Sequence, residues 1–224
     1  MMQFALHPDI RFQLRHIGAE QQPLMVVDNV LAEPQALIKA ACAAEFYVPE
    51  HTRYPGLNAR LPDDYYRLII TALRGPLQAA FGLPSSVYLN YFGYFGLVTV
   101  PPEDAQPIQN IPHHDGPDPQ QLAMVHYLSH EAFGGTGFFR HKATGFQTIG
   151  PARRDLYAET ASAELEAGKG MANYERIAEV APVFNRLIVY RGHVLHCALP
   201  CDAPLSRDPA RGRLTANGFV RPRL

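Results

Sequence analysis

The sequence predicts a mainly β protein with helices (α+β), of the double-stranded β-helix or jelly-roll type. Helical patterns fill the first part of the 224 residues, and roughly eight short strand patterns follow them, separated by turn signals. The 20 prolines and 17 glycines are spread along the chain, which suits many strands joined by turns. We expect one domain over residues 1–224, in which helical residues 1–85 pack on one sheet of a jelly-roll core at 86–220.

The composition excludes several classes of function. A formal net charge of −1 gives no broad basic surface, so nucleic acid is not an expected partner. No apolar run reaches the roughly 20 residues of a membrane span, and the first ten residues show no signal-peptide pattern. Three cysteines do not suggest a disulfide framework. We therefore expect a cytoplasmic protein without a membrane partner.

The first 85 residues are expected to support the core. Residues 1–30 are predicted to form two short strands, followed by a helix from Pro34 to Phe46. Residues 47–61 are polar and rich in turn formers, so we expect a loop there. A second helix is predicted over about 62–81. Its apolar stripe comprises Tyr66, Ile69, Ile70 and Leu73.

Aromatic, β-branched and alternating residues predict the strands of the core. The expected strands cover residues 87–100, 121–129, 137–140, 145–149, 184–190, 194–199 and 213–220. Residues 152–169 are expected to interrupt them as a helical insert. Its apolar face would consist of Leu156, Ala163 and Ala167. Such an insert could be a lid, a spacer or a contact in a homodimer.

Two imidazoles and a carboxylate follow one another at His113, His114 and Asp115. In an extended chain, residues i and i+2 share a face, so His113 and Asp115 converge while His114 points away. A His-x-Asp pair supplies two ligands of the facial triad of non-haem iron(II) oxygenases, which needs one further histidine. Alone the triplet is weak evidence, because a chain with ten histidines produces such patterns by chance.

The third ligand should come from a distant strand, and His193 and His196 are the candidates. Three residues apart in an extended segment, they face opposite sides. His196 lies in the apolar segment 194–199, where a charge is hard to bury but a neutral imidazole on a metal is satisfied. His193 is interpreted as a turn residue. Each histidine alone could instead be an ordinary hydrogen-bonded residue.

The last expected strand carries a potential anion site. Arg213 and Thr215 are two residues apart and so share a face. An arginine on an otherwise apolar strand calls for a buried anion, and its forked guanidinium suits a carboxylate. Arg211 competes for this role if the strand begins earlier. The ordinary alternative is a salt bridge to Asp202 or Asp208.

The order of these motifs resembles the prolyl-4-hydroxylase-like branch of the iron(II)/2-oxoglutarate-dependent dioxygenases. The resemblance covers about residues 86–220, and it is closest to a bacterial family assigned to that superfamily. It is carried by the segments IPHHD, VHYLS, FGGTGFFRHKATGF and FNRLIVYRGHVLH. It implies a hydroxylase that uses Fe(II) and 2-oxoglutarate, releases succinate and CO2, and takes ascorbate as a candidate reductant.

The resemblance also assigns roles to residues. The iron ligands and catalytic residues would be His113, Asp115 and His196. A carboxylate ligand at Asp115 favours hydroxylation, because halogenating relatives carry a small residue there. The 2-oxoglutarate carboxylate would bind Arg213, with Tyr127 as a hydrogen-bond donor and Thr215 at a matching hydroxyl position. The gap between the distal histidine and the arginine is longer than is usual in the family.

Substrate contacts are expected at the mouth of the cavity. The candidates are Tyr91, Tyr94, Arg140 and His141. Aromatic residues on strands are more often core residues, whereas Arg140 and His141 are polar beside two phenylalanines. A small molecule, a free amino acid or a peptide side chain fits equally well. The alternative is a cupin-like metal-binding jelly roll without oxygenase activity, or a scaffold with a vestigial site.

Overall fold

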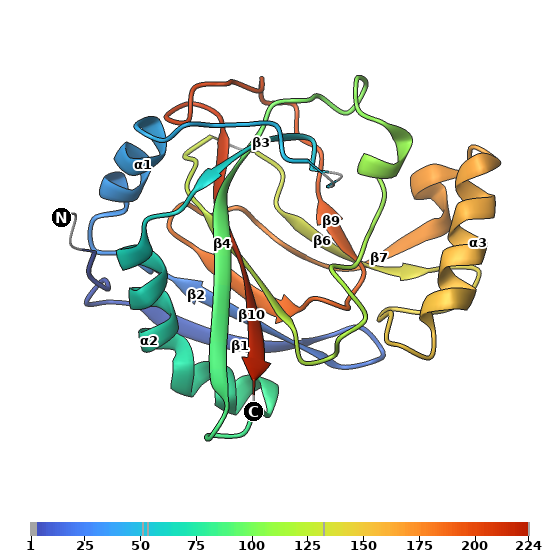
Figure 1. Ribbon diagram of the computed structural model, residues 1–224. Coiled ribbons are helices and arrows are strands. Elements are labelled where there is room, and N and C mark those ends of the chain that lie inside the picture. The colour runs from blue at the N-terminus through green and yellow to red at the C-terminus, as the bar shows by residue number, and fades with distance from the viewer. Residues whose placement is uncertain (1–3, 51, 53, 132, 224) are drawn as a thin grey trace.

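Two antiparallel sheets form the fold, a double-stranded β-helix (Figure 1). The computed structural model describes residues 4–50, 52, 54–131 and 133–223. The large sheet has the strand order β1-β2-β8-β5-β10-β4-β3 and the small sheet β7-β6-β9. The strands are β1 (Arg11–Ile17), β2 (Gln22–Asp28), β3 (Gly56–Arg60), β4 (Tyr88–Val98), β5 (Leu122–Tyr127), β6 (Thr136–His141), β7 (Tyr174–Val180), β8 (Leu187–Arg191), β9 (His196–Ala198) and β10 (Arg213–Arg223). The helices are α1 (Pro34–Cys42), α2 (Asp63–Phe81) and α3 (Arg154–Glu166), with short 3-10 turns at Pro107–Gln109 and Gly170–Asn173.

Local patterns located most elements correctly, and long-range pairing accounts for the exceptions. The loop expected at 47–61 is wrong in part, because Gly56–Arg60 forms β3 at the edge of the large sheet. Its sequence GLNAR has little strand propensity, and it is extended because it pairs with β4. Strand β7 has no counterpart among the expected strands. Residues 145–149 form a single bridge, from Thr148 to Val194.

Helices α1 and α2 cover one face of the large sheet (Figure 1), as predicted. The buried stripe of α2 recurs every four residues. It consists of Tyr65, Ile69, Leu73, Leu77 and Phe81. The predicted stripe is therefore displaced in part: Ile69 and Leu73 are buried, whereas Tyr66 and Ile70 are only half-buried at its edge. None of the described helices is both long and apolar enough to cross a bilayer.

Strands β4 and β10 are neighbours in the large sheet and present two different faces. The outer face, formed by Leu214, Ala216, Gly218 and Val220 and their partners on β4, packs on the helices. The inner face carries Arg213, Thr215, Asn217 and Phe219, which lie opposite Val98, Gly96, Tyr94 and Phe92. Phe219 packs against a cluster that includes residues of the small sheet. The inner face therefore lines the space between the sheets.

The helical insert forms α3 and lies beside the small sheet (Figure 1). The apolar face predicted for it is wrong, because Leu156 is 55% exposed. Tyr157, the next residue, is buried instead and packs with Phe139 and Tyr174. A helix with one aromatic anchor has too weak an apolar period for sequence to orient it.

Candidate metal centre

Two distant segments meet where the expected ligands lie. The backbones of His113 and His196 exchange two hydrogen bonds, each of 2.9 Å. Two residues on, the Asp115 N–H donates to the carbonyl oxygen of Gly192 at 2.8 Å. This short antiparallel pairing extends the small sheet and points both histidines to the same side. Backbone pairing, rather than side-chain contact, therefore sets the register of the site.

His113, Asp115 and His196 each offer one ligand atom, and these atoms lie within 4.8 Å of one another. The Nε2 atom of His196 is 3.6 Å from one Asp115 carboxylate oxygen, and the Nε2 atom of His113 is 3.9 Å from the other. The sequence-predicted triad is thus brought together. His193 is not part of this group and lies in the turn after β8.

The protonation of the cluster suits a cation. The Nδ1 atom of His196 is 2.8 Å from the carbonyl oxygen of Val194, so Nδ1–H donates and Nε2 keeps its lone pair. Burial lowers the pKa of His196 to about 4 and raises the pKa of Asp115 to about 6. One Asp115 oxygen is buried and has no hydrogen-bond partner among the described residues. A divalent ion between the three side chains would satisfy that oxygen, so the site fits a metal.

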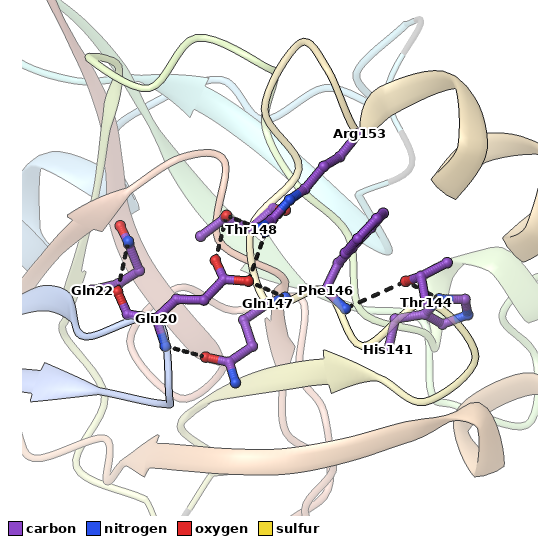
Figure 2. A network of polar contacts seen from close by, with 8 residues as sticks. All are labelled: Glu20, Gln22, His141, Thr144, Phe146, Gln147, Thr148 and Arg153. Atoms are coloured by element: carbon purple, nitrogen blue, oxygen red, sulfur yellow. Dashed lines mark hydrogen bonds and ion pairs between the residues drawn. The ribbon is translucent and has the colours of Figure 1, made fainter.

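A polar network joins Glu20, between β1 and β2, to residues 147–153 (Figure 2). The Glu20 carboxylate accepts hydrogen bonds from Thr148, Arg153 and the backbone of Gln147. Gln147 accepts in turn from the Leu195 N–H, directly before His196. The hairpin between β1 and β2 is thereby tied to the strand that carries the distal histidine.

Arg213 lies at one end of the inner face and is half-buried. Its guanidinium donates to the carbonyl oxygens of Leu199, Gly134 and Gly135. The backbone is closely packed here, because a Cβ on Gly134 would collide with the Leu199 carbonyl oxygen and one on Gly135 with the Val180 carbonyl oxygen. Three of its five donors are used, which leaves two for a ligand. Arg211, the alternative residue for the anion site, is exposed in the turn before β10.

A small pocket adjoins Arg213 and is lined in part by Tyr127 and Thr215. The Tyr127 hydroxyl is 2.7 Å from the hydroxyl of Thr136. If Thr136 donates in this bond, the Tyr127 hydroxyl hydrogen is available to an anion beside Arg213. The residues expected at the anion site therefore do share one pocket.

Two further residues on this wall, Tyr54 and Asn217, were not predicted from the sequence. The Tyr54 hydroxyl is buried and lies near the Thr215 side chain, in a geometry too poor for a regular hydrogen bond. It lies beside Gly96, where an added Cβ would be 2.6 Å from it and 2.4 Å from the Asn217 amide. Alternation along β10 from Thr215 would have identified Asn217. No local signal marks Tyr54, which precedes β3.

The substrate candidates divide into two groups. Tyr94 is on the inner face, where burial, and secondly the Asp115 charge, raise its pKa to about 12. Tyr91 is a correction: it points to the outer face and stacks on Tyr66 of α2. His141 is a second correction, because it is buried beneath α3 and bonded to Glu164 at 2.7 Å.

Arg140, the remaining candidate, pairs with Glu175 across the neighbouring strand β7. It lies on the surface of the small sheet, and this pairing gives it a structural role. Substrate contact was expected at Arg140 and His141 because they are polar beside two phenylalanines, but each side chain is paired with a glutamate instead.

A family model matches residues 8–220, and its description is a family of unknown function, DUF6445. The chain belongs to this family. No curated protein matches it.

Solved structures similar to this chain include HygX from Streptomyces hygroscopicus with nickel, 2-oxoglutarate and hygromycin B bound. The two share 13% identity with a TM-score of 0.50 over 90% of this chain and 83% of HygX. A prolyl-4-hydroxylase from Pseudomonas putida is 16% identical, with a TM-score of 0.44 over 96% and 93%. An N-substituted L-amino acid dioxygenase from Burkholderia ambifaria, in complex with alpha-KG, is 12% identical, with a TM-score of 0.43 over 99% of each chain. The likeness to HygX shows a shared fold.

Proposed function

We propose that this DUF6445 protein is a non-haem Fe(II)- and 2-oxoglutarate-dependent dioxygenase. It hydroxylates a small molecule, an amino acid or a peptide side chain and releases succinate and CO2. The observation that carries the proposal is the buried Asp115 oxygen, which lies without a hydrogen bond beside two imidazoles. HygX, which has the same fold, was solved with nickel and 2-oxoglutarate bound.

His113, Asp115 and His196 would hold the metal, which supplies the activation of dioxygen when it is bound. Asp115 contributes the negative charge, and the hydrogen bond to Val194 fixes the ring of His196. A centre held by only these three side chains would leave coordination positions for 2-oxoglutarate and dioxygen. Of the three, His196 is buried, Asp115 is half-buried and His113 is exposed, so the centre stays accessible to ligands.

Arg213, Thr215 and Tyr127 would hold 2-oxoglutarate by its distal carboxylate. The carbonyl oxygens around Arg213 fix the guanidinium before any ligand arrives, so little side-chain entropy is lost on binding. The Arg213 charge also pairs with the carboxylate in a partly buried site. Cosubstrate and metal would thus be held by different strands.

The test compares wild type with His113→Ala and Asp115→Ala. We expect wild type to take up one divalent ion and to bind 2-oxoglutarate only with that ion present, measured by calorimetry with Mn(II). With Fe(II), ascorbate and oxygen, wild type should form succinate and both variants should not. His16→Ala, on the exposed part of β1, is the matched control and should behave as wild type.

Metal uptake without any 2-oxoglutarate binding would contradict the proposal and favour a metal-binding jelly roll. A wild-type protein that takes up no metal would favour a vestigial site. Both results can be obtained without knowing the substrate.

A further inference from the structure

The inner face of β4 and β10 continues beyond Tyr94 and Asn217 to an aromatic pair. Phe92 and Phe219 are direct cross-strand partners, and their rings stack at 4.9 Å with an angle of 23°. Phe92 is 43% exposed although it faces the space between the sheets. Two stacked rings left open to solvent in that position can receive an apolar ligand.

Arg221 follows Phe219 on the same face of β10. Its guanidinium lies 5.3 Å from the centre of the Phe92 ring, and its Nε donates to the side-chain oxygen of Gln121 at 2.8 Å. In the described ranges, its two Nη nitrogens make no hydrogen bond and Arg221 forms no ion pair. Arg221 is exposed and is oriented by one bond and one ring, so its terminal donors are available to a ligand.

Gln121 connects Arg221 to the candidate metal centre. Gln121 is buried, with 4% of its surface exposed, and its backbone carbonyl oxygen accepts from the Gly192 N–H at 2.8 Å. A Cβ placed on Gly192 would be 3.2 Å from the Gln121 amide nitrogen and 3.3 Å from Asp115 Cβ. The Gln121 amide and the Asp115 side chain therefore flank the same glycine. Arg221 is separated from the metal ligand by this one buried residue.

Two arginines on the inner face of β10 lie too far apart to share one ligand. Arg213 and Arg221 are eight residues apart, about 27 Å along an extended strand. One 2-oxoglutarate molecule cannot contact both. An anion at Arg221 would therefore belong to a second molecule, at the opposite end of the inner face.

We propose that Phe92, Phe219 and Arg221 form the substrate subsite, and that the substrate is an apolar carboxylic acid. Its carboxylate pairs with the terminal nitrogens of Arg221, for which a planar fork is the matching shape. Its apolar part lies on the two phenylalanine rings and extends towards Asp115. This inference rests on the proposed function and gives its substrate a chemical class.

The test uses probes in matched pairs: 3-phenylpropanoate, indole-3-acetate and octanoate, each beside its primary amide. Binding is measured by ligand-observed NMR on the metal-free protein and on the protein with Mn(II) and 2-oxoglutarate. Succinate formation is measured in parallel. We expect at least one acid to bind at least tenfold tighter than its amide and to stimulate succinate formation.

The variants are Arg221→Gln, Arg221→Lys and Phe92→Ala. The matched control is Arg67→Gln, which changes an exposed arginine on α2. Arg221→Gln should weaken acid binding tenfold or more, raise KM for the acid and leave both kcat and the 2-oxoglutarate affinity within twofold. It should leave amide binding unchanged, whereas Phe92→Ala should weaken both probes. Arg221→Lys should restore part of the affinity for the acid, and Arg67→Gln should match wild type.

Equal binding of acid and amide, or no binding of any acid, would overturn the inference while 2-oxoglutarate binding still supports the oxygenase. Acid binding that survives Arg221→Gln would do the same. A wild-type protein that binds no 2-oxoglutarate in the presence of metal would instead remove the proposed function, and this inference with it.

Discussion

The two faces of the β4 and β10 ladder have the same backbone and the same register but opposite properties. On the outer face, Phe95, Leu97 and Leu214 are at most 1% exposed and pack on the helices. On the inner face, the side chains from Arg213 to Phe219 are all partly exposed, and most are polar or aromatic. Alternation along a strand thus separates the residues that hold the fold together from those available to ligands. The two sets should respond differently to substitution.

The largest effect expected is on stability, from Phe95→Ala on the outer face. Phe95 is 0% exposed, and its removal leaves a cavity, so we expect a loss of about 3–5 kcal/mol in the free energy of unfolding. Phe92→Ala, three residues away on the inner face, should lose under about 1 kcal/mol. Urea unfolding of the metal-free proteins measures both. Equal losses would mean that the inner face is also core.

Arg213→Gln tests the same contrast from the inner face. Losing a charge-assisted pair should weaken 2-oxoglutarate binding about 100-fold, or about 3 kcal/mol. Arg211→Gln, at the exposed competitor position, should leave the affinity unchanged. Calorimetry with Mn(II) present measures both. The reverse order would reassign the carboxylate to Arg211.

Arg213 is expected to contribute to stability as well as to ligand binding. Its side chain binds three backbone carbonyl oxygens, so Arg213→Gln should also lose about 1 kcal/mol of stability. A loss as large as that of Phe95→Ala would show that the arginine belongs chiefly to the fold.

A buried histidine interrupts the apolar outer face. His126 is bonded to the Tyr65 hydroxyl at 2.9 Å and to Asn185 at 3.1 Å, and burial lowers its pKa to about 4. The unfolded chain takes up a proton at this residue below pH 6.5, whereas the folded chain does so only near pH 4. His126 therefore makes stability fall as pH decreases from 6.5 to 4.

The contribution of His126 is measured as the difference in pH dependence between wild type and a variant. Between pH 7 and pH 5, wild type should lose about 2 kcal/mol more stability than His126→Gln, which can keep one hydrogen bond. The other titrating groups are common to both proteins and cancel. Parallel pH profiles would show that the pKa of His126 is the same in the folded and unfolded chains, which contradicts the prediction.

The sequence predicts those features that follow a local period. The helix at about 62–81 and the strand carrying Arg213 and Thr215 are confirmed in place, because their side chains repeat at 3.6 and 2 residues. The proximity of His113 and Asp115 follows from the same rule. Their meeting with His196 required a fold in which two distant segments pair, and the jelly-roll prediction supplied it.

What the sequence could not predict depends on contacts between distant segments. Strand β3 is extended because β4 offers it a partner, and Tyr54 reaches the inner face from just before that strand. Tyr91 was expected at the cavity because it lies in an aromatic strand. Its position in the alternation along β4 directs its side chain to the outer face, where it stacks on Tyr66 of α2. His141 is polar beside two phenylalanines, and only the docking of α3 explains its burial.

The smallest effects are expected on removing the hydroxyl of Thr215 or of Tyr54 from the inner face. Thr215→Val keeps the shape and removes a hydroxyl whose bond to Gly96 is long, at 3.4 Å, so stability should change by under about 0.5 kcal/mol. If that hydroxyl binds the cosubstrate, 2-oxoglutarate affinity should fall about fivefold, or about 1 kcal/mol. Tyr54→Phe removes a buried hydroxyl whose contact with Thr215 is weak, so the stability of the metal-free protein should also change by under about 0.5 kcal/mol. An inner face that binds ligands can keep such weakly bonded hydroxyls. If the inner face were a second core, both variants would lose stability and neither would change the affinity for 2-oxoglutarate.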